Sequence, residues 1–576
     1  MSAPGDSIPD WELELGLPQP EDPFMQKYIQ GRAALIDQEK SSRSDAQFRA
    51  SLTPLALSAC DIVARVRAEE RSTVWNADAE MGGHLFPGMP FALARKKMEE
   101  SNLWKIVKRM PKGALLHAHF DAMIDVEWLI EQALGLEEMG FSMSPNATGE
   151  DVNLDEVQVA FRPMGNGWKG QPLPGGDGEH GEFVSASKAA NEFASGGRQG
   201  FKDWLIRRCS ITRSESLDHH QGPDAIWRKF GSCFPIINTM LNYEPILRPA
   251  IQRLLAELLE DGVRWVDLRA CFIFQYYRKG QSSPEKDYDA FFETFGQEVE
   301  KFQATEAGSR FWGARFIWTA LRQHSKEEIV KNMLLCIETK KKFPDLISGF
   351  DFVGQEDKGR PLVDLLPEIF WFKKRCVEEG VEIPFFFHAG ECLGDGDETD
   401  ENLFDAVLLG TRRIGHGFSL FKHPLLIEHV KQKAILIESC PISNEVLRLT
   451  TNISSHPLPA LLARGVKVAL CNDDPSILGH GRNGLTHDFW QALQGWENLG
   501  LEGLGSLAEN SVRYAAYAPD QGSGAWKKDV KDGVYGQGIR AERMREWVGE
   551  WNKFCEWVIL EYAADYGSDG EDDGGG

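Results

Sequence analysis

Eight short apolar runs are spaced along the middle of this 576-residue chain, and most are separated by amphipathic stretches. The runs have the length and composition of buried β-strands. Stretches between them, such as 249–259 and 326–340, carry apolar residues at helical spacing. This alternation predicts an α/β fold, a parallel TIM (β/α)8 barrel. The predicted strands are 113–120, 263–272, 311–321, 346–353, 383–388, 413–416, 434–438 and 466–470.

Further segments flank or interrupt the predicted barrel. Helical periodicity over 45–71 and 91–109 predicts an N-terminal extension that packs on the barrel or on a partner. A long Gly- and Pro-rich insertion follows the first strand and is a candidate cover for the active site. The predicted organisation is a helical extension (1–109), a barrel (110–520) with an insertion at about 140–200, a C-terminal helical segment (521–566) and a disordered acidic tail (567–576).

Two histidines end the first predicted strand. His117 and His119 are two positions apart, so in a strand their imidazoles point to the same face. Such a pair can hold one metal ion, although alone it fits two ordinary histidines equally well.

Other chemically active residues also follow predicted strands. His388 ends the fifth strand and Glu391 comes just after it, while Asp473 and Asp474 follow the eighth. A pair of aspartates alone is usually a turn or a helix cap, and His416 alone, between two glycines, is a turn histidine. Together, however, these residues meet at the end of a barrel that carries active sites. Three imidazoles and one carboxylate suit zinc, and the remaining acids and the fourth histidine suit proton transfer.

These segments resemble the adenosine deaminase superfamily of metal-dependent hydrolases. The resemblance covers roughly 110–517, and it rests on LLHAHFD, FFFHAGE, RIGHGFSL and LCNDDP. The motifs MPKGALLH (110–117) and GFDFVGQED (349–357) are similar to the adenosine deaminase-related growth factor branch, as is the long N-terminal region. The resemblance implies one zinc ion and hydrolytic deamination of a purine nucleoside.

The resemblance also implies a role for each matching residue. The zinc ligands would be His117, His119, His388 and Asp473. Glu391 would protonate purine N1, His416 and Asp474 would orient the attacking water and move its proton, and Asp474 would lie near purine N7. Gly354 would offer its backbone N–H to the purine, and Asp121 would bind the ribose hydroxyls. One departure is Phe120-Asp121-Ala122, where the family commonly has Leu-Asp-Gly.

Competing motifs are weak. The chain has no His-Glu-x-x-His, Walker A, Gly-x-Ser-x-Gly or Cys-x-x-Cys sequence. Residues 479–484 match Gly-x-Gly-x-x-Gly but lack a following βαβ unit, so we interpret them as an active-site loop. We assign no role to CPISN (440–444), and we expect Cys440 to be a small buried residue. Trp204 fits a core tryptophan better than a base-stacking one.

Charge and composition narrow the partners. The chain carries 87 acidic and 63 basic residues, a net charge of −24, which disfavours a polynucleotide partner and suits a small neutral nucleoside. No apolar run approaches the ~18 residues of a membrane span. The first 21 residues lack the pattern of a signal peptide, and ten dispersed cysteines suggest reduced thiols. We therefore expect a cytoplasmic protein, although the resembling branch is often secreted.

The resulting expectation is a zinc-dependent deaminase that converts adenosine and deoxyadenosine to inosine and ammonia. One alternative is deamination of another aminopurine: adenine, AMP or a modified adenosine. A basic cluster near the strand ends would favour AMP, and the sequence shows none. A second alternative is a non-catalytic signalling or binding protein on a deaminase scaffold. Homodimer formation through the N-terminal region is a hypothesis from the resemblance.

Overall fold

Eight parallel strands form the centre of the protein. The computed structural model describes residues 11, 15–76, 84–144, 154–173, 181–482, 484–517 and 522–566. Two four-stranded sheets have the orders β1-β5-β6-β7 and β11-β10-β9-β8. Single parallel bridges, Ala118 to Asp473 and Phe350 to Phe385, join these sheets at both edges, so the strands close into the predicted barrel. The strands are β1 (Gly113–His119), β5 (Val263–Cys271), β6 (Gly313–Leu321), β7 (Ile347–Val353), β8 (His388–Ala389), β9 (Arg413–His416), β10 (Leu436–Ser439) and β11 (Val468–Leu470).

The fifth barrel strand is the least regular. The sequence predicts a strand over 383–388, but β8 contains only His388 and Ala389. The preceding segment still pairs with β7, because the Phe350 N–H donates to the Pro384 carbonyl at 2.9 Å and the Phe386 N–H donates to Phe350 at 3.0 Å. Proline has no N–H to donate, so it interrupts the regular ladder at this point.

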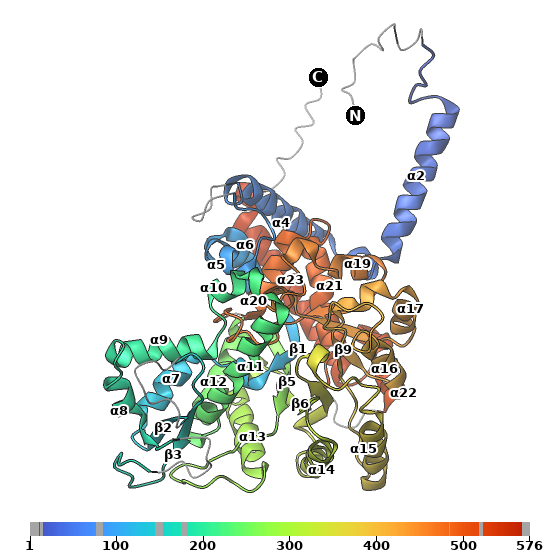
Figure 1. Cartoon of the computed structure of the whole chain (residues 1–576). Helices are drawn as coiled ribbons and strands as arrows, with labels where there is room; N and C mark the ends of the chain where they lie inside the picture. The colour runs from blue at the N-terminus through green and yellow to red at the C-terminus, as the bar shows by residue number, and fades with distance from the viewer. Residues whose placement is uncertain are drawn as a thin grey trace.

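Helices cover the outside of the barrel (Figure 1). The predicted helix 326–340 is confirmed as α14, where Ser325 and Glu328 form a capping box and Ile329, Met333 and Ile337 are buried at helical spacing. The other covering helices are α12 (Glu244–Glu260), α13 (Asp289–Gln303), α15 (Leu366–Glu379), α16 (Asn402–Leu409), α17 (Pro424–Gln432), α19 (Leu458–Ala463), α20 (Gly484–Gly495) and α21 (Gly500–Tyr514). The short α18 (Pro441–Val446) is fully buried and directly follows β10.

The N-terminal region packs with the C-terminal helix at one end of the molecule (Figure 1). Each helix predicted there is two helices: 45–71 contains α3 (Ala46–Ala50) and α4 (Pro54–Thr73), and 91–109 contains α5 (Phe91–Glu100) and α6 (Asn102–Arg109). Thr53 and Ser101 cap the second helix of each pair, and these caps explain the breaks. The α4 helix packs against the long α23 (Ile539–Tyr566), which follows α22 (Ser523–Asp532).

One N-terminal helix stands away from the body. Figure 1 shows α2 (Pro23–Ser42) projecting from the end formed by α4 and α23. None of its side chains is buried, and Phe24, Tyr28 and Leu35 are 59%, 69% and 67% exposed. A helix with exposed apolar residues and little contact with its own chain is suited to pack against a partner.

The insertion after the first strand has a small core of its own. An antiparallel sheet of order β3-β2-β4 contains β2 (Met139–Met143), β3 (Val159–Pro163) and β4 (Val184–Ser185). The surrounding helices are α7 (Val126–Gly135), α8 (Ala186–Asn191) and α9 (Gly197–Cys209). Trp204 is 2% exposed and stacks on Phe193 at 5.5 Å between ring centroids, so it is the expected core residue. Parts of the predicted insertion, 145–153 and 174–180, lie outside the described residues, as does the predicted tail 567–576.

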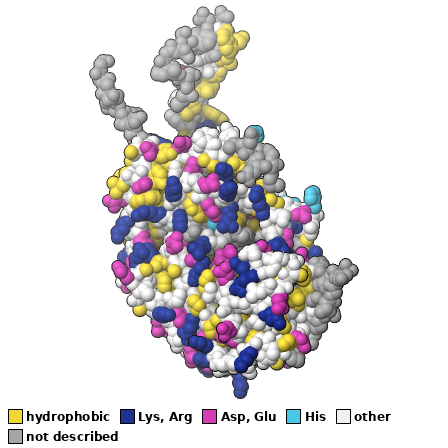
Figure 2. Space-filling model, turned by 90° about the vertical axis from the view of Figure 1, so that its left-hand side faces the viewer, with side chains coloured by type: hydrophobic (Ala, Val, Ile, Leu, Met, Phe, Trp, Pro, Cys, Tyr) yellow, Lys and Arg dark blue, Asp and Glu magenta, His cyan; other side chains and the backbone are white. Residues whose placement is uncertain are grey.

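After the insertion, α10 (Arg213–Leu217) leads into α11 (Gly222–Leu241), which packs against β3. On the face that Figure 2 shows, acidic and basic side chains are interspersed. Within the described part of the chain, no helix combines the length and apolarity needed to cross a membrane. All ten cysteines are free thiols, and Cys271 alone among them is not fully buried.

Candidate active site

Four histidines and Asp473 converge at the carboxyl ends of the barrel strands. The Nε2 atoms of His117 and His119 lie 3.2 and 3.3 Å from Oδ1 of Asp473. The ring centroids of His388 and His416 lie 4.5 and 4.8 Å from that of His117. The structure therefore brings together the predicted metal ligands, but it places His416 as close to them as they are to one another.

The backbone is strained where two of these side chains enter the site. His416 and Asp473 have φ angles of 61° and 58°, in the left-handed region that residues other than glycine rarely occupy. Each such conformation costs about 1–3 kcal/mol and persists only where the surroundings hold it. Asp473 is held by β1, because its N–H donates to the His117 carbonyl at 3.2 Å and its carbonyl accepts from the His119 N–H at 3.0 Å.

Two buried carboxylates orient two of the histidines, and neither is among the site residues predicted from the sequence. Oε2 of Glu438 lies 2.9 Å from Nδ1 of His117, and Oδ2 of Asp351 lies 2.6 Å from Nδ1 of His388. An ionised carboxylate only accepts hydrogen bonds, so each imidazole carries its proton on Nδ1. Nε2 of both His117 and His388 therefore presents a lone pair to the site, as a metal ligand must.

Arginines keep these carboxylates ionised. Arg269 donates to Asp351 and to Glu438, at 2.8 Å in both cases, and Arg413 also pairs with Glu438. Burial alone would raise the pKa of Glu438, but the two guanidinium groups hold it well below the usual range. Arg413 lies at the start of β9, where it supports this network through Glu438 and Asp267.

A cavity of about 920 Å³ opens next to the metal-ligand cluster. This volume lies near the upper end of the range of about 300–1,000 Å³ that is typical of ligand pockets. All the predicted catalytic and substrate residues line it: Asp121, Gly354, Glu391, His416 and Asp474. The cavity therefore connects the predicted metal ligands with the predicted proton-transfer groups.

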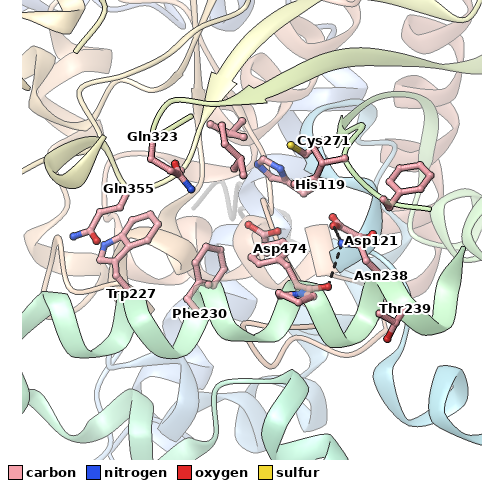
Figure 3. Close-up of a pocket in the computed structure, with 18 of the residues that line it drawn as sticks. His119, Asp121, Trp227, Phe230, Asn238, Thr239, Cys271, Gln323, Gln355 and Asp474 are labelled. Atoms are coloured by element: carbon pink, nitrogen blue, oxygen red, sulfur yellow. Dashed lines mark hydrogen bonds between the residues drawn. The ribbon is translucent and has the colours of Figure 1, made fainter. Parts of the chain in front are cut away.

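The outer wall of the cavity comes from segments outside the barrel strands. Figure 3 shows α11 running beside the cavity, with Trp227, Phe230 and Asn238 directed into it. The insertion adds Phe161 and Arg162 from β3. The sequence suggests the insertion as a candidate cover, whereas no residue of α11 is among the predicted site residues.

Two carboxyl groups in the cavity are in surroundings that favour their protonated forms. Burial, followed by the charges of Asp473 and Glu356, raises the pKa of Glu391 well above the usual range. Burial and the neighbouring Asp473 do the same to the pKa of Asp474. Oε1 of Glu391 and Oδ1 of Asp474 have no hydrogen-bond partner among the described residues. A carboxyl group that stays protonated at neutral pH can act as a general acid.

Asp121 and Gly354 both line the cavity. Oδ2 of Asp121 accepts a hydrogen bond from Nδ2 of Asn238 at 2.7 Å, the contact drawn in Figure 3. Gly354 has a φ of +102°, and a Cβ added there would lie 2.8 Å from Oε1 of Gln323. Only glycine suits this position, which lets the backbone approach whatever occupies the cavity.

One predicted loop lies away from the cavity, and one segment without a predicted role contacts the site. None of the described residues of 479–484 lines the cavity, and His480 is instead buried 4.9 Å from the Phe91 ring. CPISN, to which no role was assigned, contacts the site, because Ser443 donates to Oδ2 of Asp473 at 2.7 Å and Asn444 lies 3.1 Å from His416. Cys440 is buried, as expected.

Comparison with known proteins agrees with this geometry. The sequence pattern of the family described as adenosine deaminase matches residues 218–534. Adenosine deaminase 2 of Sus scrofa is 32% identical over 76% of this chain and 81% of its own length. An adenosine deaminase of Lutzomyia longipalpis is 32% identical over 80% of this chain and 81% of its own. The fold is similar to an amidohydrolase of Burkholderia ambifaria, with a TM-score of 0.50 and 14% identity over 80% of this chain and 95% of the other. The chain therefore belongs to the adenosine deaminase family, and its likeness to adenosine deaminase 2 proteins agrees with the branch that its motifs indicate.

Proposed function

We propose that this protein is a zinc-dependent deaminase that converts adenosine and deoxyadenosine to inosine and ammonia. One observation carries the proposal. Imidazoles whose Nε2 lone pairs face the site lie with Asp473 beside the buried acid Glu391, at the same cavity. The similar proteins from Sus scrofa and Lutzomyia longipalpis are both named adenosine deaminases, which supports the same reaction.

The residues present fit a zinc ion. Nε2 of His117 and Oδ1 of Asp473 are buried without a hydrogen-bond partner among the described residues. In a tetrahedral site with bonds of about 2.0–2.1 Å, two ligand atoms lie roughly 3.3–3.4 Å apart. The distances of 3.2 and 3.3 Å from Asp473 to His117 and His119 match that separation. We propose His117, His119, His388 and Asp473 as the ligands.

The protein's own residues would carry the proton transfers. When bound, zinc would supply Lewis-acid activation of water, whose pKa it can lower to about 7. Glu391 would hold a proton on its carboxyl group and donate it to purine N1 as the ring accepts electrons. Asp474 and His416, on the cavity wall, would orient the attacking water and keep it beside the purine carbon that bears the amino group.

The cavity suits a neutral nucleoside. We propose that Asp121 binds the ribose hydroxyls and that the Gly354 N–H binds the purine. Among the described residues that line the cavity, the cations are Arg162 and Lys358. Arg162 lies over the Phe183 ring at 4.2 Å, and Lys358 pairs with Asp224 at 3.0 Å. The two cations come from separate segments, β3 and the loop after β7, and Lys358 already pairs with an aspartate, so we propose a nucleoside rather than AMP as the substrate.

The test is ammonia release by the zinc-loaded protein from adenosine, deoxyadenosine, adenine and AMP, with Glu391→Gln as the control. We expect fast release from the two nucleosides and almost none from the variant. Ammonia release from AMP or adenine alone would change the proposed substrate but leave the proposed reaction type unchanged. No release from any purine by protein with bound zinc would favour the non-catalytic alternative.

We also propose that the chain forms a homodimer through α2. The proposal rests on the family resemblance and on the exposed apolar residues of this projecting helix. Sedimentation of the intact protein should give a dimer, and Tyr28→Asp should shift it toward the monomer. A wild-type monomer at micromolar concentration would contradict the proposal.

A further inference from the structure

The CPISN segment connects the site to a chain of buried hydrogen bonds. It begins directly after β10, and its Ser443 and Asn444 are 1% and 0% exposed. Asn444 lies between two imidazoles: Nδ2 is 3.1 Å from Nδ1 of His416, and Oδ1 is 3.0 Å from Nε2 of His456. Nδ1 of His456 in turn accepts a hydrogen bond from the backbone N–H of Leu458 at 3.1 Å.

We propose that Asn444 and His456 are positioning residues that fix His416 as a hydrogen-bond donor from Nε2 into the cavity. A proton on Nε2 excludes His416 from the metal ligands, although His416 lies as close to these ligands as they lie to one another. The structural part of the proposal depends only on the hydrogen bonds. Its catalytic consequence rests on the proposed deaminase function.

The direction of each hydrogen bond in this series follows from its last member, the backbone N–H of Leu458. The Leu458 N–H can only donate, so Nδ1 of His456 must accept. Burial lowers the pKa of His456 to about 3, so the imidazole is neutral and carries its one proton on Nε2. That N–H donates to Oδ1 of Asn444, which sets the orientation of the amide. Nδ2 of Asn444 then donates to Nδ1 of His416.

His416 is thereby left with its proton on Nε2. That atom is buried and has no hydrogen-bond partner among the described residues, and its nearest acidic oxygen is Oδ2 of Asp473 at 3.8 Å. The other group near Nδ1 is Oε1 of Glu391, at 3.4 Å. It is farther than the amide of Asn444 and does not hydrogen-bond to the ring, so it does not reverse the assignment.

The group that contacts Nδ1 distinguishes His416 from the neighbouring histidines. Ligand atoms of His117, His388, His416 and Asp473 all lie within 4.8 Å of one another, so distance alone does not separate ligands from other groups. Carboxylates contact Nδ1 of His117 and His388 and leave lone pairs on Nε2. An amide donor contacts Nδ1 of His416 and leaves a proton there. The His416 N–H can hold the attacking oxygen in place, whereas it cannot bind a cation.

The test substitutes Asn444 with a residue of the same shape that cannot donate. In Asn444→Asp, the carboxylate accepts from Nδ1 of His416, and the proton leaves Nε2. ¹⁵N NMR of the full-length, zinc-loaded protein with labelled histidine reports the tautomer, with His416→Gln used to assign the signal. We expect the proton on Nε2 in the wild type and on Nδ1 in the variant. The kcat should fall about 10–100-fold with little change in KM. Asn332→Asp, a buried amide that accepts from Trp318 away from the cavity, is the matched control.

A second pair of variants tests His456. His456→Gln keeps an N–H that can donate to Asn444, whereas His456→Phe removes it. We expect the Gln variant to retain the wild-type tautomer of His416 and the Phe variant to lose it. A wild-type proton on Nδ1, or an unchanged tautomer in Asn444→Asp, would overturn the proposal. A tautomer as proposed, in a protein that deaminates no purine, would instead contradict the proposed function and leave the hydrogen-bond chain intact.

Discussion

The two ends of the cavity are built differently. At the inner end, barrel strands deliver His117 and His388 to buried carboxylates, and arginines hold those carboxylates in turn. At the outer end, α11 and the insertion supply aromatic and amide side chains such as Phe230 and Asn238. At the inner end, hydrogen bonds fix the protonation and orientation of the imidazoles, while at the outer end the side chains define the shape of the cavity. We infer that the ends of the barrel strands determine the reaction, and that α11 and the insertion shape the space in which the substrate is recognised.

Removing one inner imidazole should have the largest effect. His117→Ala deletes a proposed ligand and leaves Glu438 without its imidazole partner. We expect the protein to lose zinc and deaminase activity together, which metal analysis and an ammonia assay would show on the same sample. Full activity in a variant that contains no metal would remove zinc from the reaction.

Glu391→Gln should keep zinc and lose most of the rate. A general acid typically contributes about 10²–10⁴-fold, and the amide of Gln is not acidic enough to give up a proton to the purine. The pKa of Glu391 is raised, so the active protonated form is present below that pKa and is lost as pH rises through it. We therefore expect the kcat of the wild type to fall on the alkaline side. A variant that turns over at the wild-type rate with an unchanged pH profile would exclude Glu391 as the acid.

The sequence predicted the inner end well, because the ligands follow strands in recognisable local patterns. It missed the carboxylates behind them, since His117 and Glu438 are 321 residues apart and only the closed barrel brings them together. Asp351 lies inside a quoted motif, and its place in a buried strand was the available signal. The outer wall was missed for a different reason: the apolar face of α11 has the pattern of any core-packing helix.

Asp351→Asn tests whether the carboxylates behind the histidines tune the metal site. The amide loses the charge that orients His388 and pairs with Arg269. We expect zinc affinity to fall about 10–100-fold, as measured by competition with a chelator. Asp267→Asn is the control, because Asp267 pairs with Arg413 in the same network but contacts no histidine. If both variants lost stability and neither lost zinc affinity in the folded protein, the carboxylates would be structural only.

Asn238→Ala should have the smallest effect and should appear in KM rather than in kcat. Asn238 holds one oxygen of Asp121, the proposed ribose contact, at the outer end of the cavity. Loss of one hydrogen bond of about 1 kcal/mol corresponds to roughly a five-fold rise in the KM of adenosine. The rise should shrink for 2′- or 3′-deoxyadenosine, whichever lacks the hydroxyl that Asp121 contacts. An equal loss of kcat on every substrate would mean that α11 supports the inner end as well, and the division between reaction and substrate recognition would fail.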